Sequence, residues 1–205
     1  MVTWAVLLDC ARAVVAAAGA PEAARVLREW PRPQAARTTV PATLPVLRWL
    51  DEAAGRAPPG VLAALARAVR DAAPLLAWRQ SYGPDEADAA FLARYGWCEL
   101  FGRSGPVPCE ALAAGILLLG PATHYPAHSH VAQEIYVPLS GTAAWQRGGA
   151  EFVVRSPGEC IVHASREAHA MRTDDAPLLA FYVWCGQGLG ESARLAGATQ
   201  RPPVG

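Results

Sequence analysis

Lysine is absent from this chain of 205 residues, and all eighteen of its basic residues are arginines. Without a lysine amine the protein cannot form a Schiff base with a carbonyl substrate, which excludes ordinary pyridoxal phosphate enzymes. Eighteen acidic residues balance the arginines, so the formal net charge is zero at pH 7. A neutral chain without a basic stripe or a recognisable helix-turn-helix pattern argues against nucleic acid or an anionic membrane as the main partner.

Long uncharged apolar runs are also missing, and no stretch of about eighteen such residues predicts a transmembrane helix. The apolar N-terminus lacks the positively charged start of a signal peptide, and Asp9 and Arg12 interrupt it, so an amphipathic helix is favoured. The five cysteines form no CxxC pair and no zinc-finger spacing. We therefore expect reduced, mostly buried thiols in a cytoplasmic protein.

The first third of the chain has the spacing of apolar residues that is typical of short helices. Gly19 after the first of them and Pro21 at the start of the second are expected helix boundaries. We expect helices over 3–18, 21–30, 45–55 and 58–74. Together they would form a cap over the rest of the chain or a surface for a homodimer.

The remaining two thirds contains short apolar or alternating segments separated by glycine and proline, which predicts strands joined by turns. Gly148 and Gly149 mark the turn of a hairpin. We expect a short helix over 85–96, and strands over 75–81, 96–102, the end of 109–120, 158–164, 169–173 and 178–186.

These elements predict a mostly β fold, a small jelly-roll-like β-barrel with an α-helical N-terminal extension. We place the extension at 1–75, the barrel at 76–190, and a polar, proline-rich tail that we expect to fray at 191–205. With 205 residues, of which 52% are apolar, the chain can bury the core of such a domain.

All five histidines lie between His124 and His169, within about a quarter of the chain. Scattered structural histidines would not crowd in this way, so the crowding indicates a metal site. If 128–136 is mostly extended, its even-numbered residues share one face, because side chains in a strand alternate with period two. That face would carry His128, His130, Glu134 and Tyr136, while Ile135, Val137 and Leu139 would pack on the other side.

The same spacing resembles the first motif of the cupins, in which His-x-His is followed after three residues by Glu and after six more by Gly. Here the motif consists of His128, His130, Glu134 and Gly141. Pro157 and Gly158, followed by His169, are similar to the second cupin motif. The chain departs from the pattern in two places, because the trailing Asn is missing and Gly120 lies further before the first histidine than usual.

A cupin barrel with inward-facing His and Glu side chains can hold one divalent metal ion and leave positions open for water or substrate. Such ligands suit Zn, Fe, Mn, Ni or Co and do not select among them. We expect His163 to be structural or to support a ligand, and the role of His124 stays open. The expected ligands are His128, His130, Glu134 and His169.

Aromatic residues accompany the expected metal site. Tyr136 shares a face with Glu134, and a phenol beside a divalent cation ionises more easily, which would let it act as a general base. The alternative is a buried Tyr136 whose hydroxyl is only hydrogen-bonded. Trp97, Tyr182 and Trp184 are either ordinary core or an aromatic wall that attracts a cationic ligand through cation–π interaction.

The string HYPAHSH, the pair Glu134 and Tyr136, and a last strand ending near Trp184 are similar to the cupin-type dimethylsulfoniopropionate (DMSP) lyases, over about 95–190. The resemblance implies a carbon–sulfur lyase that cleaves its small zwitterionic substrate into dimethyl sulfide and acrylate by β-elimination. It implies metal ligation by His130, Glu134 and His169 with His128 beside them, Tyr136 as the base near the metal, Tyr125 as a substrate-contacting tyrosine and rival base, and Trp184 at the sulfonium.

Two other functions fit the same residues. A cupin dioxygenase would use Fe in the same cage to bring O₂ and an organic substrate together, and it would need no neighbouring base. A non-catalytic cupin would bind a small molecule without turnover. Replacing Tyr136 with phenylalanine separates the three hypotheses: the lyase would lose turnover, a dioxygenase would keep most of its activity, and a binding protein would change only in affinity.

Overall fold

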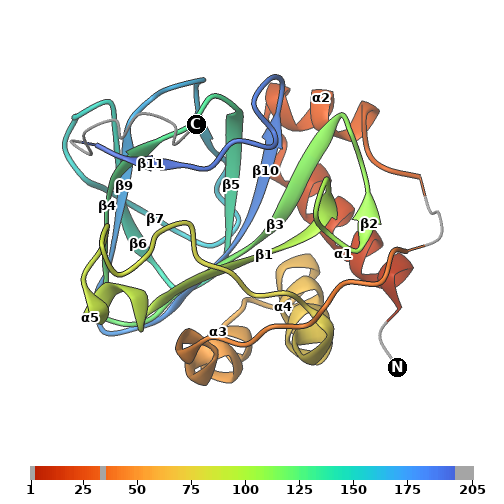
Figure 1. Cartoon of the computed structure of the whole chain (residues 1–205). Coiled ribbons are helices and arrows are strands. Elements are labelled where there is room, and N and C mark those ends of the chain that lie inside the picture. Colours follow the sequence, from red (N-terminus) through yellow and green to blue (C-terminus); the bar gives the residue numbers. More distant parts are fainter. Residues whose placement is uncertain (1–2, 33–35, 197–205) are drawn as a thin grey trace, which may run out of the picture.

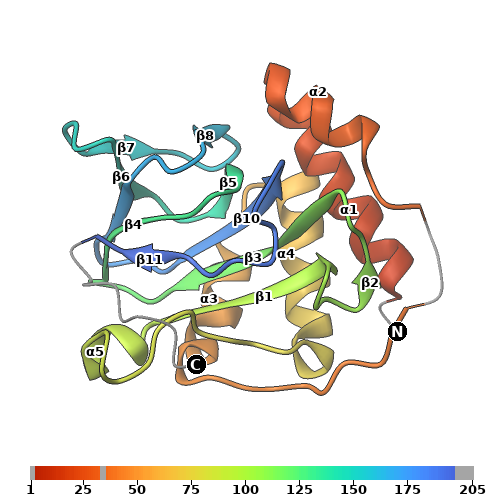
Figure 2. The same cartoon turned by 45° about the horizontal axis from the view of Figure 1, so that its top comes forward.

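Three layers make up the molecule. Helices of the first third pack against the outer face of a six-stranded sheet, and a five-stranded sheet lies across from its inner face (Figure 1). This computed structural model describes residues 3–32 and 36–196. Figure 2 shows the same layers turned forward, with α1 and α4 lying against the six-stranded sheet on the side away from β11.

The helices of the first layer begin and end within about three residues of the predicted bounds, whereas the helix expected over 85–96 was wrong in extent, because only Ala89–Leu92 is helical and a strand begins at Tyr95. Thr3 accepts a hydrogen bond from the backbone N–H of Val6 at 3.3 Å and caps α1, and Gly19 ends that helix in the left-handed conformation. Pro21 occupies the first turn of α2. The described helices are α1 (Trp4–Ala18), α2 (Pro21–Arg28), η1 (Pro45–Trp49), α3 (Leu50–Gly55), α4 (Val61–Ala72), η2 (Ala73–Leu75) and α5 (Ala89–Leu92).

The strands form two sheets. Pro126 and Pro138 each lie beside a shift in strand register, where the ladder tolerates a residue without an N–H. In the six-stranded sheet the order is β2 (Val107–Pro108), β1 (Tyr95–Gly102), β3 (Leu112–Leu119), β10 (Leu178–Cys185), β5 (Gln133–Ser140) and β8 (Ile161–His163). In the five-stranded sheet it is β11 (Arg194–Leu195), β4 (His124–Ser129), β9 (His169–Thr173), β6 (Ala143–Arg147) and β7 (Val153–Arg155).

The predicted mostly β, cupin-type fold with N-terminal helices is confirmed. Among the residues that the structure describes, no ladder of strand pairs joins the two sheets, so they face each other as a sandwich and are not closed into a barrel. The division into 1–75, 76–190 and 191–205 stays a prediction. Part of the last segment, 197–205, lies outside the described residues.

Three expectations about the strands were wrong. Residues 75–81 form no strand but only isolated bridges, at Ala77 and Arg79. Residues 128–136 are not one strand, because the chain turns at 130–132 and passes from β4 in one sheet to β5 in the other. The start of the tail does not fray, since β11 pairs with β4 and 189–193 line a pocket described below.

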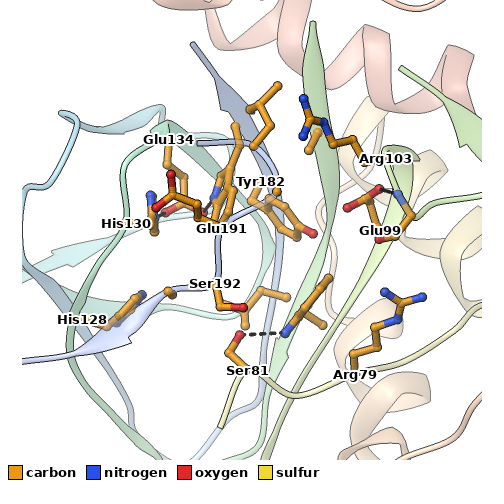
Figure 3. Close-up of a pocket in the computed structure, with 18 of the residues that line it drawn as sticks. Arg79, Ser81, Glu99, Arg103, His128, His130, Glu134, Tyr182, Glu191 and Ser192 are labelled. Carbon is orange, nitrogen blue, oxygen red and sulfur yellow. Dashed lines mark hydrogen bonds and ion pairs between the residues drawn. The ribbon is translucent and has the colours of Figure 1, made fainter. Parts of the chain in front are cut away.

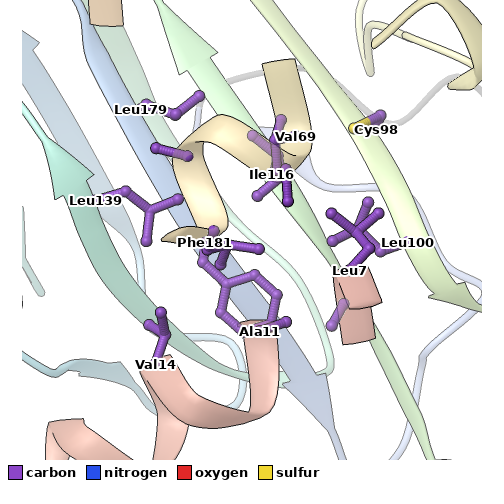
Figure 4. Packing of buried hydrophobic residues seen from close by; sticks show 14 of the residues in the cluster. Leu7, Ala11, Val14, Val69, Cys98, Leu100, Ile116, Leu139, Leu179 and Phe181 are labelled. Atoms are coloured by element: carbon purple, nitrogen blue, oxygen red, sulfur yellow. The ribbon is translucent and has the colours of Figure 1, made fainter. Parts of the chain in front are cut away.

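A single apolar core joins the helices to the six-stranded sheet. The odd-numbered residues of β10 point outward to the helices, and Figure 4 shows Phe181 among Ala11 and Val14 of α1. Burying a side chain of this size contributes about 1.5–3 kcal/mol. The even-numbered Tyr182 and Trp184 therefore point the other way, into the space between the sheets, as do Glu134 and Tyr136 of β5.

Candidate metal and active site

Three of the expected ligands meet between the two sheets. His130 directly follows β4, Glu134 lies on β5 and His169 begins β9, so both sheets contribute to the group. One ligand atom from each of the three residues lies within 4.8 Å of the others. The side chains are buried, with Glu134 and His169 each 1% exposed. A buried carboxylate facing two imidazoles has the composition and the compactness of a site for a divalent metal.

Backbone carbonyls fix the orientation of the imidazoles. Nδ1 of His128, His130 and His169 lies 2.9, 2.8 and 2.9 Å from the carbonyl oxygens of Pro126, Ala132 and Glu167, respectively. A carbonyl oxygen only accepts, so each Nδ1 must carry the proton and donate it. In each ring Nε2 is left as the nitrogen that can bind a metal. Support of this kind is usual for metal-binding histidines.

The nitrogens turned inward face one carboxylate oxygen. Nε2 of His130 lies 2.9 Å and Nε2 of His169 lies 3.3 Å from Oε2 of Glu134, and the His169 nitrogen makes no hydrogen bond within the described chain. Burial alone would raise the pKa of Glu134, but the two imidazoles hold it well below its ordinary value. Three groups with lone pairs directed at a common point fit a shared divalent cation.

The other histidines have different surroundings. His128 is not part of the group of three, but its ring lies 4.1 Å from the ring of His169, and burial lowers its pKa well below the ordinary value. The ring of His163 stacks on that of His169 at 4.0 Å and is completely buried. Burial followed by the neighbouring His169 lowers the pKa of His163 to about 3, so it is neutral at pH 7. His124 is exposed and packs near Phe152.

A pocket of about 540 Å³ opens onto the ligand group, and this volume suits a small organic molecule. Figure 3 shows His130 and Glu134 at one end and Arg79 and Arg103 at the other, with Tyr182 between them. All the predicted substrate-contacting and catalytic residues line this pocket, namely Trp97, Tyr125, His128, Tyr136, Tyr182 and Trp184. Their roles stay predictions, but the structure brings them together.

The two candidate bases differ in what their hydroxyls contact. The Tyr125 hydroxyl lies 3.2 Å from that of Tyr82 and 3.3 Å from that of Tyr95, and its ring stacks on His128 at 4.0 Å. Tyr136 lies two residues beyond Glu134 on the same face of β5. Burial first and then the Glu134 carboxylate raise the pKa of Tyr136 well above its ordinary value. Tyr125 is therefore held in a cluster of tyrosines, whereas Tyr136 lies beside Glu134 of the candidate metal site.

Trp184 has a second role that the sequence did not indicate. Its indole N–H donates a hydrogen bond of 2.6 Å to Oε1 of Glu134, and its ring lies 4.2 Å from that of His130. The bond occupies one carboxylate oxygen and turns the other toward the histidines. Trp184 thus positions Glu134 in addition to lining the pocket.

Replacing Trp184 with phenylalanine is expected to weaken metal binding by about 10–100-fold, because a hydrogen bond that orients a ligand is lost while an aromatic ring remains. A titration in competition with a chromophoric chelator measures the affinity. Trp97→Phe is the matched control, since the Trp97 indole donates to Ser81 and not to a ligand. Equal affinities for wild type and Trp184→Phe would show that the bond is dispensable.

Sequence reasoning missed several residues of the pocket. Glu99 lies two residues after Trp97 on β1, so the period of two could have placed both on the inner face. Arg79 and Arg103 lie in irregular segments, and Glu191 and Ser192 lie in the part of the chain that was expected to fray. No local pattern indicates that such segments reach the pocket, because their position depends on how distant strands pair.

The sequence model of the DMSP lyase family matches residues 19–180 of this chain. The chain belongs to the DMSP lyase family. It is 33% identical over 148 residues to the proposed DMSP lyase DddL of Cereibacter sphaeroides, covering 71% of this chain and 61% of DddL. It is 35% identical over 109 residues to the DMSP lyase DddQ of Ruegeria pomeroyi, covering 53% of this chain and 54% of DddQ. These matches span between half and two thirds of the two relatives.

Solved structures of DMSP lyases are similar to the whole described fold. One chain from the crystal structures of the DMSP lyases RdDddP and RnDddQII has a TM-score of 0.82 at 31% identity, covering 94% of this chain and 97% of that one. The crystal structure of DddQ from Ruegeria pomeroyi has a TM-score of 0.75 at 27% identity, covering 92% of this chain and 97% of DddQ. The helices therefore belong to the similarity as well as the sheets.

None of the described helices could span a membrane.

Proposed function

We propose that this chain is a metal-dependent DMSP lyase that forms dimethyl sulfide and acrylate by β-elimination. The observation that carries the proposal is the convergence of His130, Glu134 and His169 at one end of a pocket walled by aromatic rings, in a chain of this family. DMSP has a carboxylate at one end and a dimethylsulfonium at the other. The pocket offers a metal site for the first and aromatic faces for the second.

His130, Glu134 and His169 would hold one divalent metal ion, of Zn, Fe, Mn, Ni or Co. When bound, such an ion polarises the substrate carboxylate, makes the adjacent α-hydrogen more acidic and favours the phenolate of a neighbouring tyrosine. His128 packs against His169 and narrows the same end of the pocket. The substrate carboxylate is thereby directed to the end of the pocket where Tyr136 lies.

Tyr136 is the proposed general base. Its oxygen takes the proton from the α-carbon, the electron pair left there forms the carbon–carbon double bond, and the β carbon–sulfur bond breaks with its electrons going to sulfur. Tyr182 and Trp184 face the position of the sulfonium and would stabilise its charge without requiring a hydrogen bond. Tyr182 is buried and Trp184 is half-buried, so the two rings would also limit the access of water to the developing carbanion.

The test is the release of dimethyl sulfide and acrylate from purified, metal-loaded protein given DMSP. We expect equal amounts of the two products, loss of both after treatment with a chelator, and recovery when a divalent metal is returned. Metal-loaded protein that releases neither product would contradict the proposed substrate. Oxygen consumption, or binding of a small molecule without turnover, would then favour the dioxygenase or the binding protein.

A further inference from the structure

The pocket continues well beyond the part that DMSP can fill. Glu134 lies on β5 and Glu99 on β1, and β10 and β3 separate these strands. Neighbouring strands lie about 4.8 Å apart, so the three steps from β5 to β1 amount to roughly 14 Å. DMSP has only two carbons between its carboxylate and its sulfur. Bound by its carboxylate at the metal ligands, it reaches Tyr182 and Trp184 on β10 and leaves the far end empty.

The far end of the pocket is built on a turn that is held from both sides. Oε1 of Glu99 accepts hydrogen bonds from the backbone N–H groups of Ser104 at 2.8 Å and Gly105 at 2.7 Å. On the other side Arg37 donates to the carbonyl oxygens of Gly102 at 2.9 Å and Arg103 at 2.6 Å. The backbone that carries Arg103 is therefore fixed before any ligand binds, which lowers the entropy cost of recognition.

The guanidinium of Arg103 is poorly neutralised. Its Nε lies 3.3 Å from Glu110, but both side chains are largely exposed, so water and salt weaken this pair. Its terminal nitrogens make no hydrogen bond within the described chain, and Nη1 lies close enough to Gly190 that a Cβ there would be 3.2 Å away. Arg103 thus extends from its turn to the opposite wall of the pocket.

Arg79 supplies a second positive charge at this end (Figure 3). Its backbone pairs with that of Trp97, which fixes its place beside β1, and its side chain has no acidic partner among the residues described. Two arginines with free terminal nitrogens, on fixed backbone and in one pocket, form an arrangement that binds carboxylate or phosphate groups.

The charges along the pocket alternate. A cation site lies at His130 and Glu134, aromatic rings follow at Trp184 and Tyr182, and two arginines lie at the far end. Two further carboxylates line the pocket: Glu99 is engaged through Oε1 with the backbone of the turn, and Glu191 follows Gly190 on the opposite wall. The complementary ligand is negative at its first end, positive in the middle and negative again at its second end. DMSP supplies only the first two of these charges.

We propose that Arg79 and Arg103 form an anion subsite, and that the preferred substrates are sulfonium carboxylates in which one S-methyl group is replaced by an alkyl arm ending in an anionic group. This inference rests on the proposed lyase function. The reaction stays the same: the base takes the α-proton, the β carbon–sulfur bond breaks with its electrons on sulfur, and the products are acrylate and a neutral thioether that carries the anionic arm.

Two synthetic substrates of matched size test the subsite. In both, one S-methyl group of DMSP is replaced, by a 3-carboxypropyl arm in the first and by a butyl arm in the second. Both release acrylate, so one assay gives KM and kcat for each. We expect the KM of the carboxylated substrate to be about tenfold lower, as one or two charge-assisted hydrogen bonds would provide. Equal KM values would overturn the subsite.

Variants of the two arginines test whether they cause the preference for the carboxylated substrate. The measured quantity is the KM of the butyl substrate divided by the KM of the carboxylated substrate. This ratio should fall toward one in Arg103→Gln, in Arg79→Gln and in the double variant. Arg28→Gln is the control, because Arg28 is exposed on α2 and does not line the pocket, and it should keep the wild-type ratio. A ratio that survives in the double variant would also overturn the subsite.

A binding measurement separates failure of the subsite from failure of the lyase reaction. In the analogues, a carboxymethyl group replaces the carboxyethyl arm that faces the metal site, so no acrylate can form. Calorimetry compares the affinity of an analogue that carries the second carboxylate with that of one that lacks it. If no substrate releases acrylate but wild type prefers the second carboxylate and the double variant does not, the subsite stands and the lyase function falls. If DMSP is cleaved but calorimetry shows no preference, the subsite falls and the lyase function stands.

Discussion

Glu134→Ala should bind metal at least about 100-fold more weakly than wild type and release almost no dimethyl sulfide. The carboxylate is the only negatively charged member of the buried group, and the removal of one of three ligands costs more than the loss of a supporting contact. His130 and His169 face its Oε2 and Trp184 donates to its Oε1, and none of these three side chains carries a negative charge that could replace it. Metal content by mass spectrometry and affinity by titration measure the effect.

Two further variants make this result interpretable. Glu134→Gln keeps the volume and can still accept the Trp184 hydrogen bond, so it tests the charge with little change to the fold. Glu151→Ala removes an exposed carboxylate outside the pocket and should bind metal like wild type. Circular dichroism reports whether each variant is folded. A folded Glu134→Gln with wild-type metal affinity would show that the negative charge of Glu134 is not needed to bind the ion.

Tyr136→Phe should lower kcat on DMSP by about 10²–10⁴-fold and leave metal content unchanged, because the loss of a general base has an effect of this size. The ring remains, so its packing against Trp145 at 5.0 Å is retained. Tyr125→Phe is the matched comparison. Its hydroxyl already contacts those of Tyr82 and Tyr95, so we expect a smaller loss that comes from changes in the shape of the pocket.

The two tyrosine variants also test the assignment of the base. Single-turnover measurements at saturating DMSP report on proton abstraction and separate it from substrate binding. If Tyr125→Phe lost turnover while Tyr136→Phe kept it, Tyr125 would be the base. If both variants kept turnover with metal bound, the proton would have to be taken by another group, and the elimination mechanism proposed for Tyr136 would be wrong.

Local patterns in the sequence predicted much of the fold. Thr3, Gly19 and Pro21 mark helix ends through their own backbone and side-chain chemistry, and the helices begin and end near these residues. The alternation of Ile135, Val137 and Leu139 with Glu134 and Tyr136 predicted that the two sets lie on opposite sides of the strand, and this is confirmed. These features depend on a few neighbouring residues, so a single sequence contains them.

Features that depend on long-range pairing could not be predicted in this way. His128 and Glu134 share a parity, but they converge because β4 and β5 belong to facing sheets and not because one strand carries both. Arg103 reaches the pocket only because Glu99 and Arg37 hold its turn against a distant part of the chain. The spacing of the cupin motif therefore indicated His130 and Glu134, which the structure brings together with His169, while the single strand assumed to carry 128–136 was wrong.

Packing on the outer face of the six-stranded sheet limits which side chains this family can exchange. Phe181 and Leu139 pack among Ala11 and Val14, so both faces of their strands are buried (Figure 4). A larger side chain at Ala11 would need a smaller one opposite it, since close-packed interiors tolerate little change in volume. The helical third contains no chemical motif, yet its small residues have to change together with the strands that carry the candidate metal site.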